Sequence, residues 1–232
     1  MKMKTIGIIG GLGPETTAEF YLEILFSCHQ KNKKQRPPIL IWNVPLDLKI
    51  EEDLLLRSKG EERYLPFLID AAKRLENVGA DFLVLPCNTL HIFIDDIRKA
   101  VDIPVLSILE ETANFLKKKK IKRVGMLATS ASLQNKLYEK HLVKEGIEQV
   151  IPNDLDQARI GKIISKLVVS RHANKDREEL LKIIDKFEKK GVSTVLLACT
   201  DLQLLIPEHS SLEIFDTMKI LADASVDEIL GE

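Results

Sequence analysis

The chain has 232 residues, 45% of which are hydrophobic, and this content is enough to fill a packed core and argues against disorder. Its 34 Lys and Arg residues nearly balance its 35 Asp and Glu residues, so the net charge of −1 leaves no global field that would draw it to nucleic acid or to an anionic membrane. No apolar run approaches the roughly 18 residues of a spanning helix, and three cysteines suit a reducing compartment better than a disulfide framework, so we expect a cytoplasmic protein.

Short apolar runs alternate along the chain with longer segments of helical periodicity. The predicted strands are 5–10, 39–44, 81–86, 104–108, 123–128 and 194–198. Continuous apolar strands of this kind are buried on both faces, as in parallel sheets. Three apolar stripes at helical spacing lie between them: Ala18, Tyr21, Leu22 and Leu25; Leu68, Ala71, Ala72 and Leu75; and Leu180, Ile183, Ile184 and Phe187. This order predicts an α/β fold with right-handed crossovers.

Two stretches of the chain resemble each other closely enough to indicate a duplication. RLENVGADFLVLPCNTL aligns with KFEKKGVSTVLLACTDL without a gap and places Cys87 opposite Cys199, 112 residues apart. Upstream, KTIGIIGGLG resembles KRVGMLATSA, with Gly7 opposite Gly125. This period is far too long for a solenoid, whose repeats run roughly 20 to 50 residues, so it indicates a duplicated domain.

We therefore predict two similar lobes, each a mainly parallel sheet flanked by helices and related by pseudo-twofold duplication. Residues 1–103 together with 209–232 would form the first lobe, and residues 104–208 the second. Pro104 would then open the first strand of the second lobe, and Pro207 would mark the return to the first.

The segment GGLGPETT at 10–17 follows a predicted strand and opens a predicted helix. Pro14 suits the first helical position. The amides of Gly11, Leu12 and Gly13 would then form an anion site for a carboxylate or a phosphate. Because Thr16 stands where the dinucleotide fingerprint needs a third glycine, nicotinamide binding is the weaker interpretation. A tight turn without a ligand is the other alternative.

Cys87 in PCNTLH and Cys199 in ACTDLQ each follow a predicted strand. Ligands gather beyond the carboxyl ends of such strands, and the N-terminus of a following helix favours a thiolate. A single free cysteine is often only a small buried hydrophobe. Two at equivalent places in a duplicated chain indicate instead a pair of thiols on opposite sides of one small molecule. That geometry suits the transfer of a proton from one face of a carbon to the other.

The third cysteine and the histidines receive weaker interpretations. Cys28 continues the apolar stripe of the first predicted helix and is expected to be a core or semi-exposed residue. Zinc binding by Cys87, His91 and Cys199 is weakly indicated, because no C-x-x-C pair accompanies them, and we predict no metal site. His91 is expected to hydrogen-bond near the thiol or to cap the structure.

The motifs GGLGPETTAEFY, PCNTLH and LACTDLQLL together resemble the aspartate/glutamate racemase family, in its aspartate racemase branch, and the likeness covers nearly the whole chain. The resemblance implies an amino-acid racemase that needs no cofactor, with its site between two α/β lobes. In the family one cysteine acts as thiolate base and the other as thiol acid, and Cys87 and Cys199 fill both positions. The resemblance also implies an amino-acid ligand and a homodimer.

Without a pyridoxal cofactor, the carbanion formed at the α-carbon must be stabilised by hydrogen bonds and dipoles aimed at the substrate carboxylate. The predicted donors are the amides of Gly11, Leu12 and Gly13 and the side chains of Asn88, Thr89, Thr129, Ser130 and Thr200.

Family members that act on acidic substrates bind the distal carboxylate with basic residues. Arg159 stands about where a relative carries a lysine, and Lys49 could replace an arginine that another branch carries after the second strand. If Ile50 occupies that place instead, no basic side chain is available there to bind the distal carboxylate. Aspartate is therefore the preferred substrate, and glutamate or a less acidic amino acid stays open.

Two other functions stay open. A relative of maleate isomerase, arylmalonate decarboxylase or hydantoin racemase would keep the strand-end cysteines and change the chemistry, although the GGLGP opening favours the racemase. A non-catalytic amino-acid-binding protein of the same fold would use Lys49 and Arg159 as carboxylate clamps.

Overall fold

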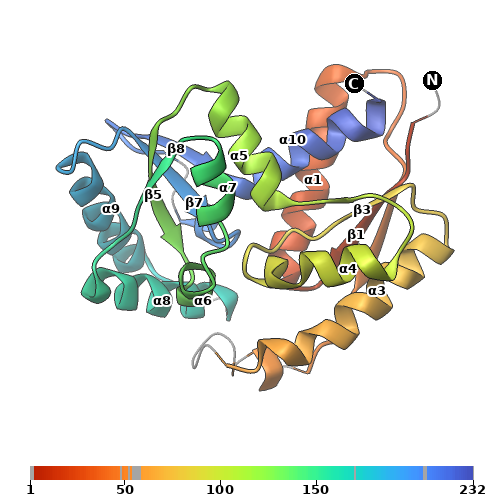
Figure 1. The fold of residues 1–232 in the computed structure, drawn as a ribbon, viewed down its shortest axis with the longest axis horizontal. Coiled ribbons are helices and arrows are strands. Elements are labelled where there is room, and N and C mark those ends of the chain that lie inside the picture. Colours follow the sequence, from red (N-terminus) through yellow and green to blue (C-terminus); the bar gives the residue numbers. More distant parts are fainter. Residues whose placement is uncertain are drawn as a thin grey trace.

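A computed structural model describes residues 3–47, 49–51, 53, 59–169, 171–205 and 208–231. They form two four-stranded sheets flanked by helices (Figure 1). The first sheet has the order β2-β1-β3-β4, the second has the order β6-β5-β7-β8, and the paired strands are parallel throughout. The strands are β1 (Ile6–Gly10), β2 (Ile39–Asn43), β3 (Phe82–Val84), β4 (Val105–Leu106), β5 (Arg123–Ala128), β6 (Glu148–Val150), β7 (Thr194–Ala198) and β8 (Glu213–Asp216).

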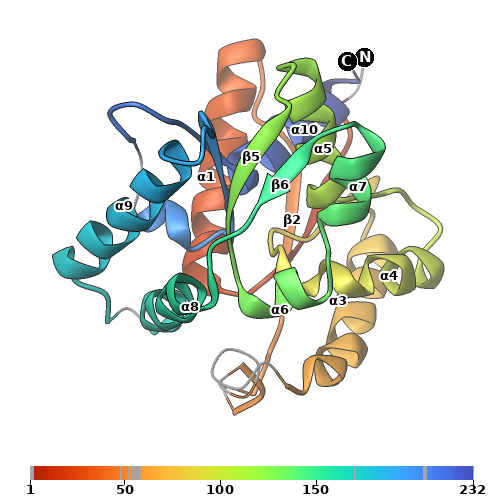
Figure 2. The same cartoon turned by 60° about the vertical axis from the view of Figure 1, so that its left-hand side comes forward.

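Helices connect the strands as crossovers and cover both sheets (Figures 1 and 2). The α-helices are α1 (Pro14–Lys31), α3 (Leu65–Asn77), α4 (Ile94–Ala100), α5 (Ile108–Lys118), α6 (Ser130–Gln134), α7 (Glu139–Lys144), α8 (Asp154–Val168), α9 (Asn174–Glu188) and α10 (Thr217–Leu230). The 3₁₀-helices are η1 (Glu61–Tyr64), η2 (Thr89–Phe93) and η3 (Leu202–Leu204). Within the described part of the chain, no helix combines the length and the apolar character needed to cross a membrane.

Three hydrophobic clusters hold these layers together. The central cluster joins the facing sides of the two sheets through α1, α5 and α10, which lie between the sheets in Figure 1. A second cluster packs α3 and α4 on the outer face of the first sheet, and a third packs α8 and α9 on the outer face of the second. Because the central core is shared, the two sheets are held in a fixed relation to each other.

A glycine on one strand of each sheet supports the duplication. A Cβ atom on Gly7 would lie 2.6 Å from Leu83 and 3.2 Å from Leu75 of α3. A Cβ atom on Gly125 would lie 2.9 Å from the ring of Phe187 in α9. Leu75 and Phe187 are themselves partners in the gapless alignment. In both halves the missing side chain of the strand glycine therefore lets the outer helix pack closely against the sheet. The predicted α/β fold of two similar sheets is confirmed.

The predicted sheet membership of two segments is wrong. Val105 pairs with Leu83, so the strand that follows Pro104 completes the first sheet instead of opening the second. Asp216 pairs with Leu197, so β8 belongs to the second sheet although residues 209–232 were expected in the first lobe. In each half the fourth strand follows a short helical segment and returns beside the third. The division of the chain into lobes stays a prediction, and Pro207 lies outside the described residues.

The helix that follows β8 does pack against the first half, as expected. Leu221 of α10 and Ile24 of α1 share the central core. Ser27 of α1 also donates a hydrogen bond of 2.8 Å to Asp223. Strands β6 and β8 were not predicted, because β6 is short and half polar and β8 is half-buried, and neither shows a clear apolar run.

The predicted core stripe of α1 is also wrong, whereas those of α3 and α9 are confirmed. Tyr21 and Leu22 face solvent, and the buried face carries Phe20, Ile24 and Cys28 with polar neighbours such as Thr17. Thr17 is tolerated there because its hydroxyl donates to the carbonyl of Gly13. The stripe was predicted to face the core because it is apolar, but it lies on the exposed face of the helix. Cys28 is nevertheless a core residue, as expected.

Gly125→Ala should lower the free energy of unfolding by about 1–3 kcal/mol, because the added methyl group would overlap the Phe187 ring in a packed core. Urea denaturation of the purified proteins measures this change. Gly161→Ala in α8 is the matched control, since a Cβ atom there meets nothing within 4 Å, and it should be neutral or slightly stabilising. Equal stability of the two variants would contradict the proposed packing role.

Candidate active site

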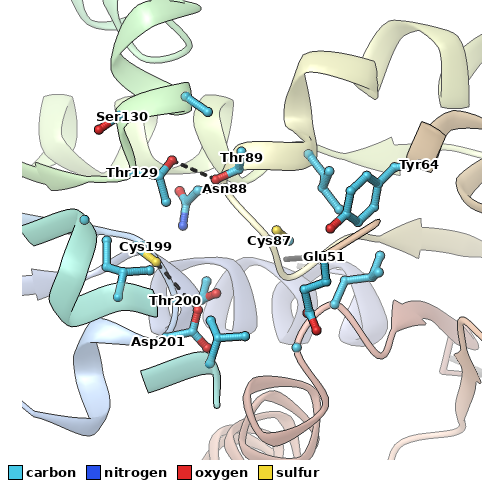
Figure 3. A pocket seen from close by; sticks show the side chains of 17 residues that line it. Glu51, Tyr64, Cys87, Asn88, Thr89, Thr129, Ser130, Cys199, Thr200 and Asp201 are labelled. Carbon is cyan, nitrogen blue, oxygen red and sulfur yellow. Dashed lines mark hydrogen bonds between the residues drawn. The ribbon is translucent and has the colours of Figure 1, made fainter. Parts of the chain in front are cut away.

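One pocket of about 770 Å³, including its open mouth, lies between the two halves (Figure 3). Its wall includes the segments that directly follow β1, β3, β5 and β7, the central strands of the two sheets. Ligands bind at this edge in parallel sheets because the strand order reverses there and leaves a crevice. The lining residues are Leu12, Gly13, Glu51, Tyr64, Cys87, Asn88, Thr89, Leu90, Thr129, Ser130, Ala131, Gly161, Ile164, Val168, Cys199, Thr200 and Asp201.

Both predicted cysteines line this pocket, one from each half. Cys87 follows β3, which ends before Pro86, a residue that cannot donate to the strand ladder. Cys199 directly follows β7 and is buried. Figure 3 shows the two thiols on opposite sides of the pocket. Within the described residues, no group of three or more His, Cys, Asp or Glu side chains could hold a metal ion.

Desolvation dominates the ionisation of both thiols. Burial raises the pKa of Cys87 to about 12, although the backbone N–H groups of Leu90 and Thr89 act in the opposite direction. Burial and then the charge of Asp201 raise the pKa of Cys199 well above its usual value. The backbone amides therefore favour the thiolate at Cys87, as expected, but the loss of hydration outweighs them and the net shift of the pKa is upward.

Asp201 is a pocket residue that the sequence interpretation missed, although it stands in the quoted motif ACTDLQ. The Cys199 thiol lies 3.6 Å from one of its carboxylate oxygens. The hydroxyl of Thr16, in the first turn of α1, donates to the other at 2.8 Å. Burial raises the pKa of Asp201. This carboxyl group therefore connects the second thiol to the first half of the chain.

Asn88 is buried and joins three parts of the chain beside the pocket. Its side-chain amide donates to the hydroxyl of Thr217 at 3.0 Å, and its side-chain carbonyl accepts from the hydroxyl of Tyr138. Thr217 in turn donates to the carbonyl of Leu197 in β7 at 2.8 Å. The segment after β3 is thus fixed to the strand that carries the other cysteine.

Hydroxyl groups connect the two halves on the same side of the pocket. The hydroxyl oxygens of Thr89 and Thr129 are 2.9 Å apart, and Thr129 also donates to Ser132 at 2.9 Å. The oxygen of Thr129 accepts the backbone N–H of Ser132, as an N-cap of α6 does. Ser130 and the buried Thr200, two of the predicted donors, also line the pocket.

His91 has the capping role that the sequence suggested. The backbone N–H of Ile108, the first residue of α5, donates to Nε2 at 3.1 Å. The protonated Nδ1 then donates to the carbonyl of Cys87 at 2.7 Å. Burial lowers the pKa of His91 to about 4. The neutral ring therefore ties the backbone of Cys87 to the start of a core helix.

Three of the predicted ligand-binding residues lie outside the pocket wall, namely Gly11, Lys49 and Arg159. The amide of Gly11 donates to Thr17 at 2.9 Å, so it is not aimed at a ligand, whereas Leu12 and Gly13 do line the pocket. Lys49 is exposed and is not a lining residue. These positions therefore offer fewer donors than expected.

Arg159 also points away from the pocket. Its guanidinium lies 3.6 Å from Asp156 and 3.5 Å from Glu179. The pocket face of α8 carries Gly161 and Ile164, and Arg159 precedes Gly161 by two residues, about 200° around the helix. The proposed clamp for a distal carboxylate is thus engaged elsewhere.

Two other pocket residues, Tyr64 and Glu51, come after β2 in the sequence, and no sequence motif identified them. Tyr64 is buried beside Cys87 and Glu51, and burial followed by these two neighbouring charges raises the pKa of its hydroxyl. Glu51 is half-buried, and burial raises the pKa of its carboxyl group. Neither belongs to a recognisable motif, so only the structure identifies them.

The fold and the site define a class of protein: a two-sheet α/β protein that presents one thiol from each half to a shared pocket. Residues 9–225 match the model of the family described as Asp/Glu/Hydantoin racemase. The chain belongs to this family, and it is an isomerase.

Individual relatives cover almost the whole chain. The broad specificity amino-acid racemase RacX of Bacillus subtilis (strain 168) is 28% identical in an alignment 235 positions long that covers 97% of this chain and 98% of that protein. The structure of an aspartate racemase homologue from Pyrococcus horikoshii OT3 is 30% identical with a TM-score of 0.78, covering 99% of this chain and 100% of that chain. The aspartate racemase of Picrophilus torridus is 25% identical with a TM-score of 0.80, covering 98% and 94%.

The buried neutral histidine predicts a pH-dependent stability. Because the pKa of His91 is lowered on folding to about 4 from an ordinary 6.5, the unfolded chain takes up the proton first as the pH falls. The stabilisation is complete above pH 6.5 and is lost as the pH falls from there toward 4, by up to about 3 kcal/mol.

His91→Gln should remove this dependence, and it should cost about 1–3 kcal/mol at pH 7 through lost hydrogen bonds. Urea denaturation of both proteins at pH 7 and pH 5 measures the difference between them. That comparison matters because burial raises the pKa of Asp216 to about 7, which gives a trend of opposite sign in both proteins. Identical pH dependence of the two proteins would contradict the assignment.

Proposed function

We propose that this protein racemises an amino acid by moving the α-proton between Cys87 and Cys199. The observation that carries the proposal is the position of these two thiols, which line opposite sides of one pocket at equivalent strand ends of a duplicated fold. Family membership supports the same reaction. A second base is needed because a single base would return the proton to the face from which it came.

The reaction takes two proton transfers through a carbanion. The thiolate on one face removes the α-proton and becomes a thiol, and the electron pair passes into the substrate carboxylate. The thiol on the other face then donates its proton to the α-carbon and becomes a thiolate. The product has the opposite configuration, and the protein is left with the two protonation states exchanged, ready for the reverse reaction.

The developing charge on the substrate carboxylate needs donors that are already in place. Asn88, Thr89 and Thr129 lie together on one side of the thiols in Figure 3. The side-chain amide of Asn88 uses one N–H for Thr217 and keeps the other for a ligand, and the hydroxyl groups of Thr89 and Thr129, which are bonded to each other, would turn to donate to it. The substrate carboxylate would lie on that side. Leu12 and Gly13, which precede the N-terminus of α1, also line the pocket and would add backbone dipoles.

Because the pKa values of both thiols are raised, we expect the bound substrate itself to help form the thiolate. Burial raises the pKa of both thiols and so favours their protonated forms at neutral pH. A bound α-ammonium group would offset the negative charge of Asp201 and favour a thiolate close to it. The thiolate would then form mainly in the complex.

The preference for aspartate stays a prediction, and no described residue of the pocket wall supports it. No Lys or Arg side chain belongs to the pocket wall formed by the described residues, so a distal carboxylate would find no cation there. The alternative of a non-catalytic binding protein relied on Lys49 and Arg159, which lie outside that wall, so it loses its support. The cytoplasmic location also stays a prediction.

We also propose that the protein is a homodimer, as the resemblance implied. The exposed side of α1 carries Tyr21, Leu22 and Phe26, the last with 59% of its surface accessible. Apolar patches of this kind mark interaction sites, because burying them removes apolar surface from water.

Single substitutions at either catalytic cysteine test the two-base mechanism. Cys87→Ala and Cys199→Ala should each lower the racemisation rate by about 10²–10⁴-fold, the usual contribution of a positioned acid or base. Each variant could still exchange the α-proton of one enantiomer with deuterium from solvent. Chiral chromatography and mass spectrometry in D₂O measure both quantities without added cofactor.

Cys28→Ala is the matched control, because this third thiol is buried in the central core and does not line the pocket. It should leave the racemisation rate of the folded protein unchanged. Full racemase activity in either of the other two variants would remove the two-base mechanism.

Phe26→Glu should dissociate the proposed dimer, because a charge in the middle of an apolar interface is costly to desolvate. Size-exclusion chromatography with light scattering measures the mass. Val143→Glu is the control, since Val143 is exposed to 67% on α7, away from this patch, and it should stay dimeric. A monomeric wild-type protein, or a dimeric Phe26→Glu variant, would contradict the assignment.

A further inference from the structure

The charged residues of the pocket wall are all acidic among the residues that the structure describes. They are Glu51 and Asp201. Burial and then the charge of Asp201 raise the pKa of Glu51, so the two carboxyl groups are close enough to influence each other. Within the described residues, the Glu51 carboxylate has no ion pair or hydrogen bond. Among these residues nothing offsets the charge of this half-buried carboxylate, and the positive charge of a ligand would do so.

The two acidic residues and the hydrogen-bond donors occupy opposite sides of the pocket. In Figure 3, Asn88, Thr89 and Thr129 lie on one side of the thiols, and the carboxylates of Glu51 and Asp201 lie on the other. An amino acid placed with its carboxylate toward the donors would direct its cationic parts toward the acids. The wall near the thiols is otherwise largely apolar, since Leu12, Leu90, Ile164 and Val168 contribute to it.

We propose that Glu51 determines specificity and that the substrate is an amino acid whose side chain carries an amine or a guanidinium group. The α-ammonium group pairs with Asp201, the side-chain cation pairs with Glu51, and the apolar wall contacts the methylene groups between them. This inference rests on the proposed racemase function and replaces the acidic substrate predicted from the sequence.

Charge balance favours this substrate over aspartate or glutamate. A second carboxylate on the substrate would add to the negative charge of Glu51 and Asp201, and like charges that share one pocket repel each other. A side-chain cation neutralises one of them. The same cation also favours ionisation of Cys87, because the charges of Asp201 and Glu51 both disfavour its thiolate.

The test compares lysine with norleucine, which has a side chain of similar length and no charge, and with aspartate and glutamate. Racemisation is followed by chiral chromatography, and α-deuterium exchange is measured in D₂O for every substrate. For the wild-type protein, kcat/KM should be at least tenfold higher for lysine than for norleucine, because a hydrogen bond to a charged group discriminates by about that factor or more. Aspartate and glutamate should be slower than norleucine.

Glu51→Gln keeps the shape of the side chain and removes its charge. It should lower kcat/KM for lysine about tenfold more than for norleucine, mainly through KM, because the contact is remote from the reacting carbon. Glu62→Gln is the matched control, since Glu62 is exposed in η1 and outside the pocket wall, and it should change neither substrate.

The possible results separate this inference from the proposed function. Faster racemisation of aspartate or glutamate than of lysine, or equal losses for lysine and norleucine in Glu51→Gln, would overturn the specificity while leaving the racemase function intact. Absence of racemisation and of α-deuterium exchange with every amino acid would overturn both.

Discussion

The site depends on hydrogen bonds that cross between the two halves of the molecule. Asn88, from the segment after β3, is bonded to Thr217 and Tyr138, and Thr217 is bonded to β7. Thr89 meets Thr129 in the same region. These groups are buried or half-buried, and leaving one unpaired would cost about 1–3 kcal/mol. The halves therefore have one favourable arrangement, and that arrangement places the ends of β3 and β7 across the pocket from each other.

Burial in that arrangement both creates the site and opposes its chemistry. A proton transfer to and from carbon benefits from the exclusion of water, since fixed dipoles act more strongly there. The same loss of water raises the pKa of Cys87 and Cys199 and so disfavours their thiolates. The positive charge of a bound amino acid resolves this conflict, because it favours the thiolate only when there is a substrate to deprotonate.

Duplication made much of this structure predictable from sequence. The alignment of Gly7 with Gly125 predicted equivalent strands, and in the structure both glycines pack under an outer helix. The alignment of Cys87 with Cys199 predicted equivalent strand ends, and both cysteines line the pocket. The membership of β4 and β8 could not be obtained in this way, since each is a short strand whose neighbour is chosen by tertiary pairing. The buried face of α1 was missed because Thr17 and Ser27 belong to it, and their hydroxyl groups find partners only in the folded chain.

The charges of the pocket were the least predictable feature. Arg159 had a plausible position by resemblance, yet the rotation of α8 directs it to Asp156 and Glu179. Glu51 reaches the pocket from a segment after β2 that has no motif. Sequence spacing specifies which residues follow a strand, but helix rotation and loop paths decide which side chains meet a ligand.

The most direct measurement of the central claim is the isotopic content of both enantiomers during racemisation by the wild-type protein in D₂O, sampled at low conversion. Two thiols on opposite faces predict a product that carries deuterium at the α-carbon while the remaining substrate still carries protium, because the donor of the new hydrogen is not the group that removed the old one. A product that retains the substrate's own protium would show that a single group serves both faces and would contradict the account.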